Sequence, residues 1–239
     1  SNVHTKYGFF ANAHGLEPRN VDRSVHDQSN RDILYPYQEV NHFKVINKSM
    51  YNSKNWKFES DLGYQRNYRE EWSQYAPHGY MPAVFPKSLD FNPELERQFE
   101  KDIYSVNAKL FYNASDKTQV STGINAEYKE NNIGGRGFII PAFQHLNLGS
   151  FLVAKYNYSK KSLFQAGIRY DHGNVNVSSY NDWFVSPNYE NGDTTQVYLK
   201  RADDIARNFS NLSWSIGYNY NPDNWSYKFN LGKSFRMPI

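Results

Sequence analysis

Strict alternation of apolar and polar side chains is the feature of this sequence that most limits its fold. In NWKFESDLGYQRN, residues 55–67, every second position is mostly apolar, as at Trp56, Phe58 and Leu62, and the positions between them are polar or glycine. Successive side chains of a β-strand point to opposite faces, so this period of two predicts a strand with one apolar face. The pattern leaves open whether a protein core or a membrane covers that face.

The same alternation recurs along most of the chain. Short segments rich in Asn, Asp, Ser and Lys join the alternating strands in pairs, which predicts four hairpins with turns near 52–54, 115–117, 159–161 and 221–223. The seven further strands are expected at residues 40–51, 103–114, 118–130, 148–158, 162–171, 209–220 and 224–235. A ninth strand is expected at residues 3–12.

The strands and their connections are unlike those of a soluble sheet. The predicted strands have about 10–13 residues, whereas soluble strands usually have about 5–6. Connections at one end are short turns, and those at the other end are long segments predicted as loops, at 68–102, 131–147 and 172–208. Short turns at one rim and long loops at the other are typical of outer-membrane barrels.

Aromatic residues gather beside the predicted turns and not at the strand centres. Tyr and Trp concentrate at membrane interfaces because the ring lies in the apolar zone while its polar group stays hydrated. The mid-strand apolar positions are smaller, as at Ala108 and Ala154. The predicted interface residues are Tyr51, Trp56, Tyr112, Tyr156, Tyr158, Phe164, Tyr220 and Trp225.

These patterns predict an all-β protein, an antiparallel up-and-down transmembrane β-barrel of which the chain holds about eight or nine strands. A soluble β-sandwich is the alternative fold. The residues expected to face lipid include Leu110, Ala126, Leu152, Ile168, Ile216 and Phe229. The residues expected to face the lumen include Lys109, Glu127, Lys155, Arg169 and Lys228.

Composition argues against several classes of partner and of structure. The net charge of +3 comes from 27 basic and 24 acidic residues that are interspersed, which argues against nucleic-acid binding. The sequence has no apolar run of the 18 or so residues that a membrane helix needs. Cysteine is absent, so disulfides and thiolate metal sites are not expected.

Several short motifs resemble a known family. HGLEPRN (14–20), QEVNHFK (38–44), DLGYQRNYREEW (61–72), GRGFIIPAF (135–143) and the terminal KSFRMPI resemble the barrel of TonB-dependent outer-membrane receptors, particularly those of Bacteroidetes. The resemblance implies a barrel of about 22 strands in the outer membrane of a Gram-negative bacterium. It also implies an N-terminal plug and a TonB-contacting segment. We expect that residues 1–239 are part of the barrel domain, and that the plug and the remaining strands lie outside this chain.

No motif predicts catalysis. The adjacent carboxylates Glu70–Glu71 and Asp203–Asp204 are neighbours in extended chain and point to opposite sides, so they form no acid–base pair. The seven histidines lack the close spacing of a metal site. We therefore expect no catalytic residue, no metal site and no cofactor.

Two predicted outer loops are rich in aromatic residues and proline. They are YAPHGYMPAVFP (75–86) and SSYNDWFVSPNYENG (178–192). Loops on a rigid scaffold often carry recognition, although these rings could equally pack one loop on another. The candidate ligand-binding residues are Tyr75, His78, Tyr80, Trp183, Phe184 and Tyr189.

The resemblance favours a TonB-dependent transporter that imports a scarce nutrient, most often an iron–siderophore type of chelate. The expected partners are outer-membrane lipid, the TonB complex through the plug, and the nutrient chelate. The alternatives are a passive porin, a barrel enzyme such as a protease or phospholipase, and a soluble β-sandwich binding module.

Overall fold

The computed structural model describes residues 7–12, 15–20, 36–190 and 192–235. The chain divides into two compact units, Ser1–Tyr37 and Gln38–Ile239, which are considered separately. No helix among these described residues is long and apolar enough to cross a membrane.

The first unit contains one small hairpin. Strand β1 (Tyr7–Asn12) pairs antiparallel with β2 (Gly15–Asn20) in a two-stranded sheet. The expected ninth strand at 3–12 is confirmed over its described part, which pairs with β2 in a sheet of its own, and residues 3–6 lie outside the described residues. Strand β2 was not predicted because its glycine and its proline, Pro18, are both disfavoured in strands.

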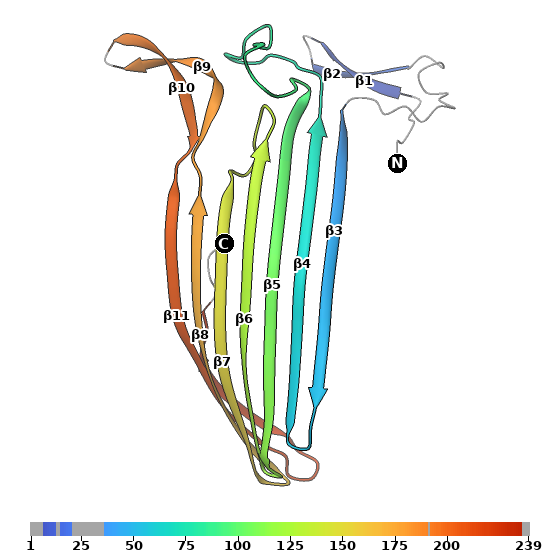
Figure 1. Cartoon of the computed structure of the whole chain (residues 1–239), viewed down its shortest axis with the longest axis vertical. Coiled ribbons are helices and arrows are strands. Elements are labelled where there is room, and N and C mark those ends of the chain that lie inside the picture. The colour runs from blue at the N-terminus through green and yellow to red at the C-terminus, as the bar shows by residue number, and fades with distance from the viewer. Residues whose placement is uncertain (1–6, 13–14, 21–35, 191, 236–239) are drawn as a thin grey trace. The chain divides into compact units, whose positions relative to one another are not determined.

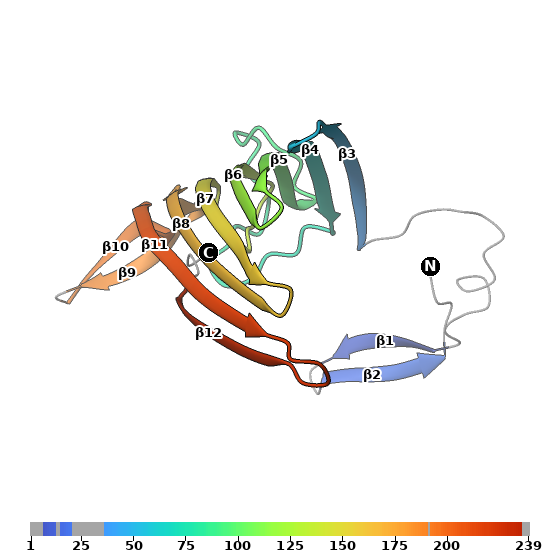
Figure 2. The same ribbon diagram turned by 90° about the horizontal axis from the view of Figure 1, so that it is seen from below.

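The second unit is built on one eight-stranded sheet with the order β3-β4-β5-β6-β7-β8-β11-β12, an up-and-down meander (Figure 1). All pairs from β4 to β12 are antiparallel. Seen along its strands, the sheet is curved (Figure 2). The strands are β3 (Tyr37–Asn52), β4 (Trp56–Trp72), β5 (Leu95–Ser115), β6 (Thr118–Gly134), β7 (Phe143–Ser159), β8 (Ser162–Val177), β11 (Ile205–Tyr220) and β12 (Tyr227–Lys233).

The four predicted hairpins are confirmed. The connections cover residues 53–55, 116–117, 160–161 and 221–226, at one end of the sheet (Figure 1). Serine side chains stabilise two of these turns: Ser115 Oγ accepts from the Thr118 backbone N–H at 3.1 Å, and Ser159 Oγ accepts from that of Lys161 at 3.2 Å. In a third turn, Asp223 adopts φ 38°, which aspartate tolerates better than most residues.

The prediction of plain loops at the other end is partly wrong. The strands continue past their predicted ends, as in β4 to Trp72 and β5 from Leu95. Within the predicted loop 172–208, β9 (Tyr180–Glu190) and β10 (Asp193–Ala202) form an additional hairpin. The alternation weakens at these strand ends because polar residues stand on both faces, as Glu70 and Glu71 do on β4.

The register confirms the predicted separation of faces. Ala108 is paired with Ile124, and Ile124 with Ser150. Paired residues lie on the same face, so the even-numbered residues of β5, β6 and β7 form one face of the sheet. All six residues expected to face lipid lie on this face, and all five expected to face the lumen lie on the other.

The apolar face is exposed among the described residues. Leu95 is the one buried hydrophobic side chain among the described residues, whereas Ile124, Ile216 and Phe229 are each more than half exposed. A soluble sandwich would bury such side chains against a second sheet. The exposed apolar band favours contact with lipid over a soluble sandwich for this sheet.

Candidate functional site

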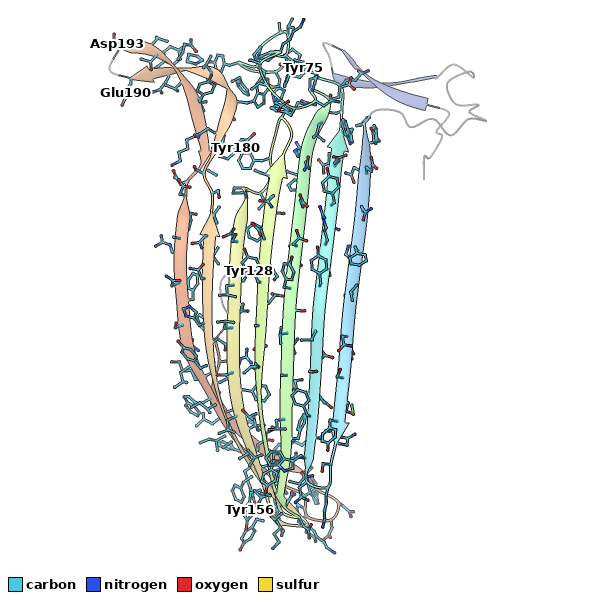
Figure 3. All side chains as sticks on the ribbon, viewed as in Figure 1. Tyr75, Tyr128, Tyr156, Tyr180, Glu190 and Asp193 are labelled. Atoms are coloured by element: carbon cyan, nitrogen blue, oxygen red, sulfur yellow. The ribbon has the colours of Figure 1, made fainter. Side chains whose placement is uncertain are left out.

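An aromatic belt lies beside the short turns. Trp56 stacks on Tyr112 with ring centroids 4.1 Å apart, and Phe164 lies 4.5 Å from Tyr218. Figure 3 labels Tyr156 at this end of the sheet. Tyr51, Tyr158, Tyr220 and Trp225 are also exposed here, so the structure gathers the predicted interface residues at one rim. Their contact with the lipid headgroups remains a prediction.

A second belt lies across the outer part of the sheet, and it was not singled out from the sequence. Tyr64, Tyr104 and Tyr128 are paired in one row on the apolar face, with ring centroids 5.0 and 6.4 Å apart. Tyr64 lies eight residues beyond Trp56 on β4, which is about 26 Å along the strand and about 20 Å along the membrane normal at the usual tilt. The two belts therefore enclose an apolar band of membrane height.

Above the second belt, aromatic rings from two outer segments pack together. Phe85 is the centre of the group, 5.4 Å from the ring of Tyr75, 5.2 Å from Phe91 and 5.1 Å from Trp183. We call Tyr75, Phe85, Phe91 and Trp183 the outer aromatic cluster. It joins the β4–β5 connection to the β9–β10 hairpin.

Arg136 links the outer aromatic cluster to the β6–β7 connection. Its side chain is only 9% exposed and lies 3.9 Å from the Glu96 carboxylate. The guanidinium donates to Ser73 Oγ and to the Gln74 carbonyl, and it lies 5.9 Å from the centre of the Tyr75 ring. The Arg136 carbonyl accepts from Trp183 Nε1 at 2.8 Å. One arginine therefore contacts all three outer connections.

Comparison with known proteins identifies the fold family. The sequence matches the family described as TonB dependent receptor-like, beta-barrel, over residues 3–239. The chain belongs to the TonB-dependent receptor family. The barrels of this family reside in the outer membrane of Gram-negative bacteria, which assigns the apolar face to lipid and the polar face to the lumen.

Solved structures support the same fold. The copper transporter OprC is 13% identical with a TM-score of 0.55, covering 84% of this chain and 32% of that chain. The FrpB iron transporter from Neisseria meningitidis (F3-3 variant) is 14% identical with a TM-score of 0.55, covering 82% of this chain and 28% of that chain. The receptor chain thus spans about a third of the length of these two structures. None of the curated proteins compared is significantly similar to it.

The predicted ligand-binding residues of this receptor chain divide into two groups. Tyr75 and Trp183 belong to the outer aromatic cluster, and the Trp183 ring contacts Phe184 at 5.1 Å. By contrast, His78, Tyr80 and Tyr189 are exposed. The first group packs the outer segments against one another, and the side chains of the second group are accessible to a ligand.

Two phenols, one in the outer aromatic cluster and one near it, have raised pKa values. Burial raises the pKa of Tyr75, and the nearby Arg136 charge opposes this shift. Its hydroxyl donates to the Pro82 carbonyl at 2.5 Å. Burial also raises the pKa of Tyr180, whose ring lies 4.0 Å from Phe138. Both groups act as neutral packing elements at ordinary pH. In the described part of the chain, no cluster of three or more histidine, aspartate or glutamate residues could hold a metal ion.

Gly135 fixes the path of the chain into Arg136. Its φ is 83°, and a Cβ placed there would lie 2.9 Å from the Leu95 carbonyl oxygen. Gly135→Ala should therefore destabilise this connection by about 1–2 kcal/mol, because an L side chain is unfavourable in this conformation.

Hydrogen exchange of the intact receptor measures this effect. Amides of residues 135–143 should exchange roughly 5–30 times faster in Gly135→Ala, as that free-energy change implies. Gly137→Ala is the matched control, because a Cβ there would meet the Glu96 carbonyl oxygen at an ordinary 3.6 Å. Equal exchange in the two variants would show that the positive φ does not constrain the connection.

Proposed function

We propose that the intact protein is a TonB-dependent transporter that imports a scarce nutrient, and that this chain forms part of its barrel wall and outer recognition surface. The family membership supports this, as does the naming of the two similar structures as copper and iron transporters. The observation that carries the proposal is the position of the outer aromatic cluster and its exposed neighbours, above a band of residues that faces lipid.

The finer assignment is an iron chelate of the siderophore type, taken up by a receptor of the Bacteroidetes type. The TonB complex would act through a plug outside this chain, and the complete barrel would have about 22 strands.

Uptake in cells tests this function. A deletion strain should lose energised uptake of a labelled ferric chelate and grow poorly when that chelate is the iron source. Inactivating the TonB complex should have the same effect. If flux persists without the TonB complex, and the purified protein lets sugars swell liposomes freely, the protein is a porin and the proposal fails.

The exposed rings should determine affinity. We expect the combined change His78→Ala, Tyr80→Ser and Tyr189→Ser to weaken binding of the transported chelate by about tenfold or more, because exposed rings offer large contact area at low entropic cost. Equilibrium binding to the intact receptor measures this. Tyr158→Ser is the control, since Tyr158 is equally exposed but lies at the turn rim. Unchanged affinity in the triple variant would remove these residues from the site.

A further inference from the structure

A cavity of about 710 Å³ lies on the lumenal face of the sheet, at the outer ends of β4 to β8. A single row of the register forms its floor: Asn67 is paired with Lys101, Lys101 with Asn131, Asn131 with Phe143, and Phe143 with Val177. Five strands therefore present one side chain each to the same space. The volume is that of a pocket for a small organic molecule.

The cavity lies on the outer side of the second aromatic belt. On β4, β5 and β6, its floor is three residues beyond the second aromatic belt, as Asn67 is beyond Tyr64. Three residues correspond to about 10 Å along the strand and about 7 Å along the membrane normal at the usual tilt. A ligand in this cavity would be reached from the outer aqueous side.

The apolar wall of the cavity is only half covered. Ile139 and Ile140 line it but are 62% and 54% exposed. Hydrogen bonds hold both ends of their connection: Gly137 N donates to the Glu96 carbonyl at 2.9 Å, and Ser178 N donates to the Ala142 carbonyl at 2.9 Å. The two isoleucines are therefore held in place over the cavity, and more than half of each side chain is available to contact a ligand.

The polar wall offers positive charge and hydrogen-bond donors. Arg69 and Lys101 line the cavity, and none of its described lining residues is acidic. Arg69 donates to Glu71, but its Nε has no acceptor. The Lys101 side chain has no ion pair or hydrogen bond with any described residue. Asn131 is 6% exposed, and its Nδ2 is likewise without an acceptor in the described residues.

We propose that this cavity binds a small organic anion with an apolar body. The anionic group lies by Lys101 and Arg69, which are diagonal neighbours across β4 and β5. The apolar body lies under Ile139 and Ile140, against Phe99 and Phe143. The inference rests on the proposed function and deepens it, since it names the charge and the apolar surface by which the imported compound would be recognised.

Two probes that differ only in charge test the proposal. The intact receptor, plug included, is placed in lipid nanodiscs and titrated with 2-naphthoate or with the neutral 2-naphthalenemethanol by saturation-transfer NMR. Empty nanodiscs give the lipid background. We expect saturable binding of 2-naphthoate, at least several-fold tighter than that of the neutral probe.

Matched variants then measure the contributions of the polar wall and the apolar wall to binding separately. Lys101→Met should weaken 2-naphthoate binding by about tenfold and leave the neutral probe unchanged. Lys109→Met is the control, because Lys109 lies on the same strand and face but outside the cavity. Ile139→Ser combined with Ile140→Ser should weaken both probes.

Three results would overturn the proposal: no saturable binding, as when the plug fills the cavity; equal affinity for both probes; or equal effects of the two lysine variants. Uptake with and without the TonB complex is measured separately in cells. Energised uptake without probe binding would leave the transport function standing and reject only the cavity as its binding site.

Discussion

Arginine in place of Ala108 will cost the receptor about 2–4 kcal/mol of folding free energy in lipid, whereas arginine in place of the adjacent Asn107 will cost little. Ala108 lies midway between Tyr104 and Tyr112 on β5, and it is paired with Ser60 and Ile124 on the apolar face. An arginine there reaches the centre of the membrane. An arginine at Asn107 points to the lumen, where Asp61 on the neighbouring strand is its direct partner.

Equilibrium folding of the intact receptor into lipid vesicles measures both changes, with urea as denaturant. The two positions are adjacent on one strand and at one depth, so backbone propensity and strand position are matched. Equal losses of stability would mean that the face carrying Ala108 does not contact lipid.

Replacing Arg136 by methionine will release the outer connections from one another without unfolding the sheet. The Arg136 side chain is only 9% exposed, and its loss removes the hydrogen bonds to Ser73 Oγ and to the Gln74 carbonyl. Glu96 keeps its ion pair with Arg97 at 2.8 Å. Hydrogen bonds to charged groups contribute about 1.5–3 kcal/mol each, so we expect local opening to become easier by about 2–3 kcal/mol.

Hydrogen exchange detects this opening. Amides of residues 73–94 and 180–202 should exchange roughly 30–150 times faster, and those of β5 and β6 below the second belt should not change. Arg201→Met is the matched control, because Arg201 also pairs with a carboxylate, that of Asp182 at 2.7 Å, but its side chain is 48% exposed. If Arg201→Met accelerates exchange as much as Arg136→Met, the buried network is not what holds the segments together.

The sequence predicted the membrane part of the fold because that part obeys a local rule. Adjacent residues such as Leu110 and Lys109, or Ile168 and Arg169, point to opposite faces of their strand. The register then places residues of the same kind side by side on neighbouring strands. The turns follow from residues within each turn, such as Ser115. No distant contact is needed to predict either feature.

Features outside the membrane depend on contacts between distant residues. The β9–β10 hairpin has mixed faces, and Arg136 lies in a GGRG segment that by itself suggests only a loop. The cavity exists because Asn67, Lys101 and Asn131 fall in one row, which no single strand reveals. The ligand candidates were chosen as aromatic loop residues, and this criterion could not separate the packed Tyr75 and Trp183 from the exposed Tyr189.

Spin-label accessibility along β5 is the most direct test that this chain forms a barrel wall between lipid and lumen. Single cysteines from 103 to 112, labelled in the intact receptor in vesicles, report collisions with oxygen, which is enriched in lipid, and with a water-soluble nickel complex. We predict a period of two, with oxygen collisions highest at the even positions and greatest near 108, and nickel collisions highest at the odd positions. Equal exposure of both sets to nickel, or a period other than two, would contradict the account.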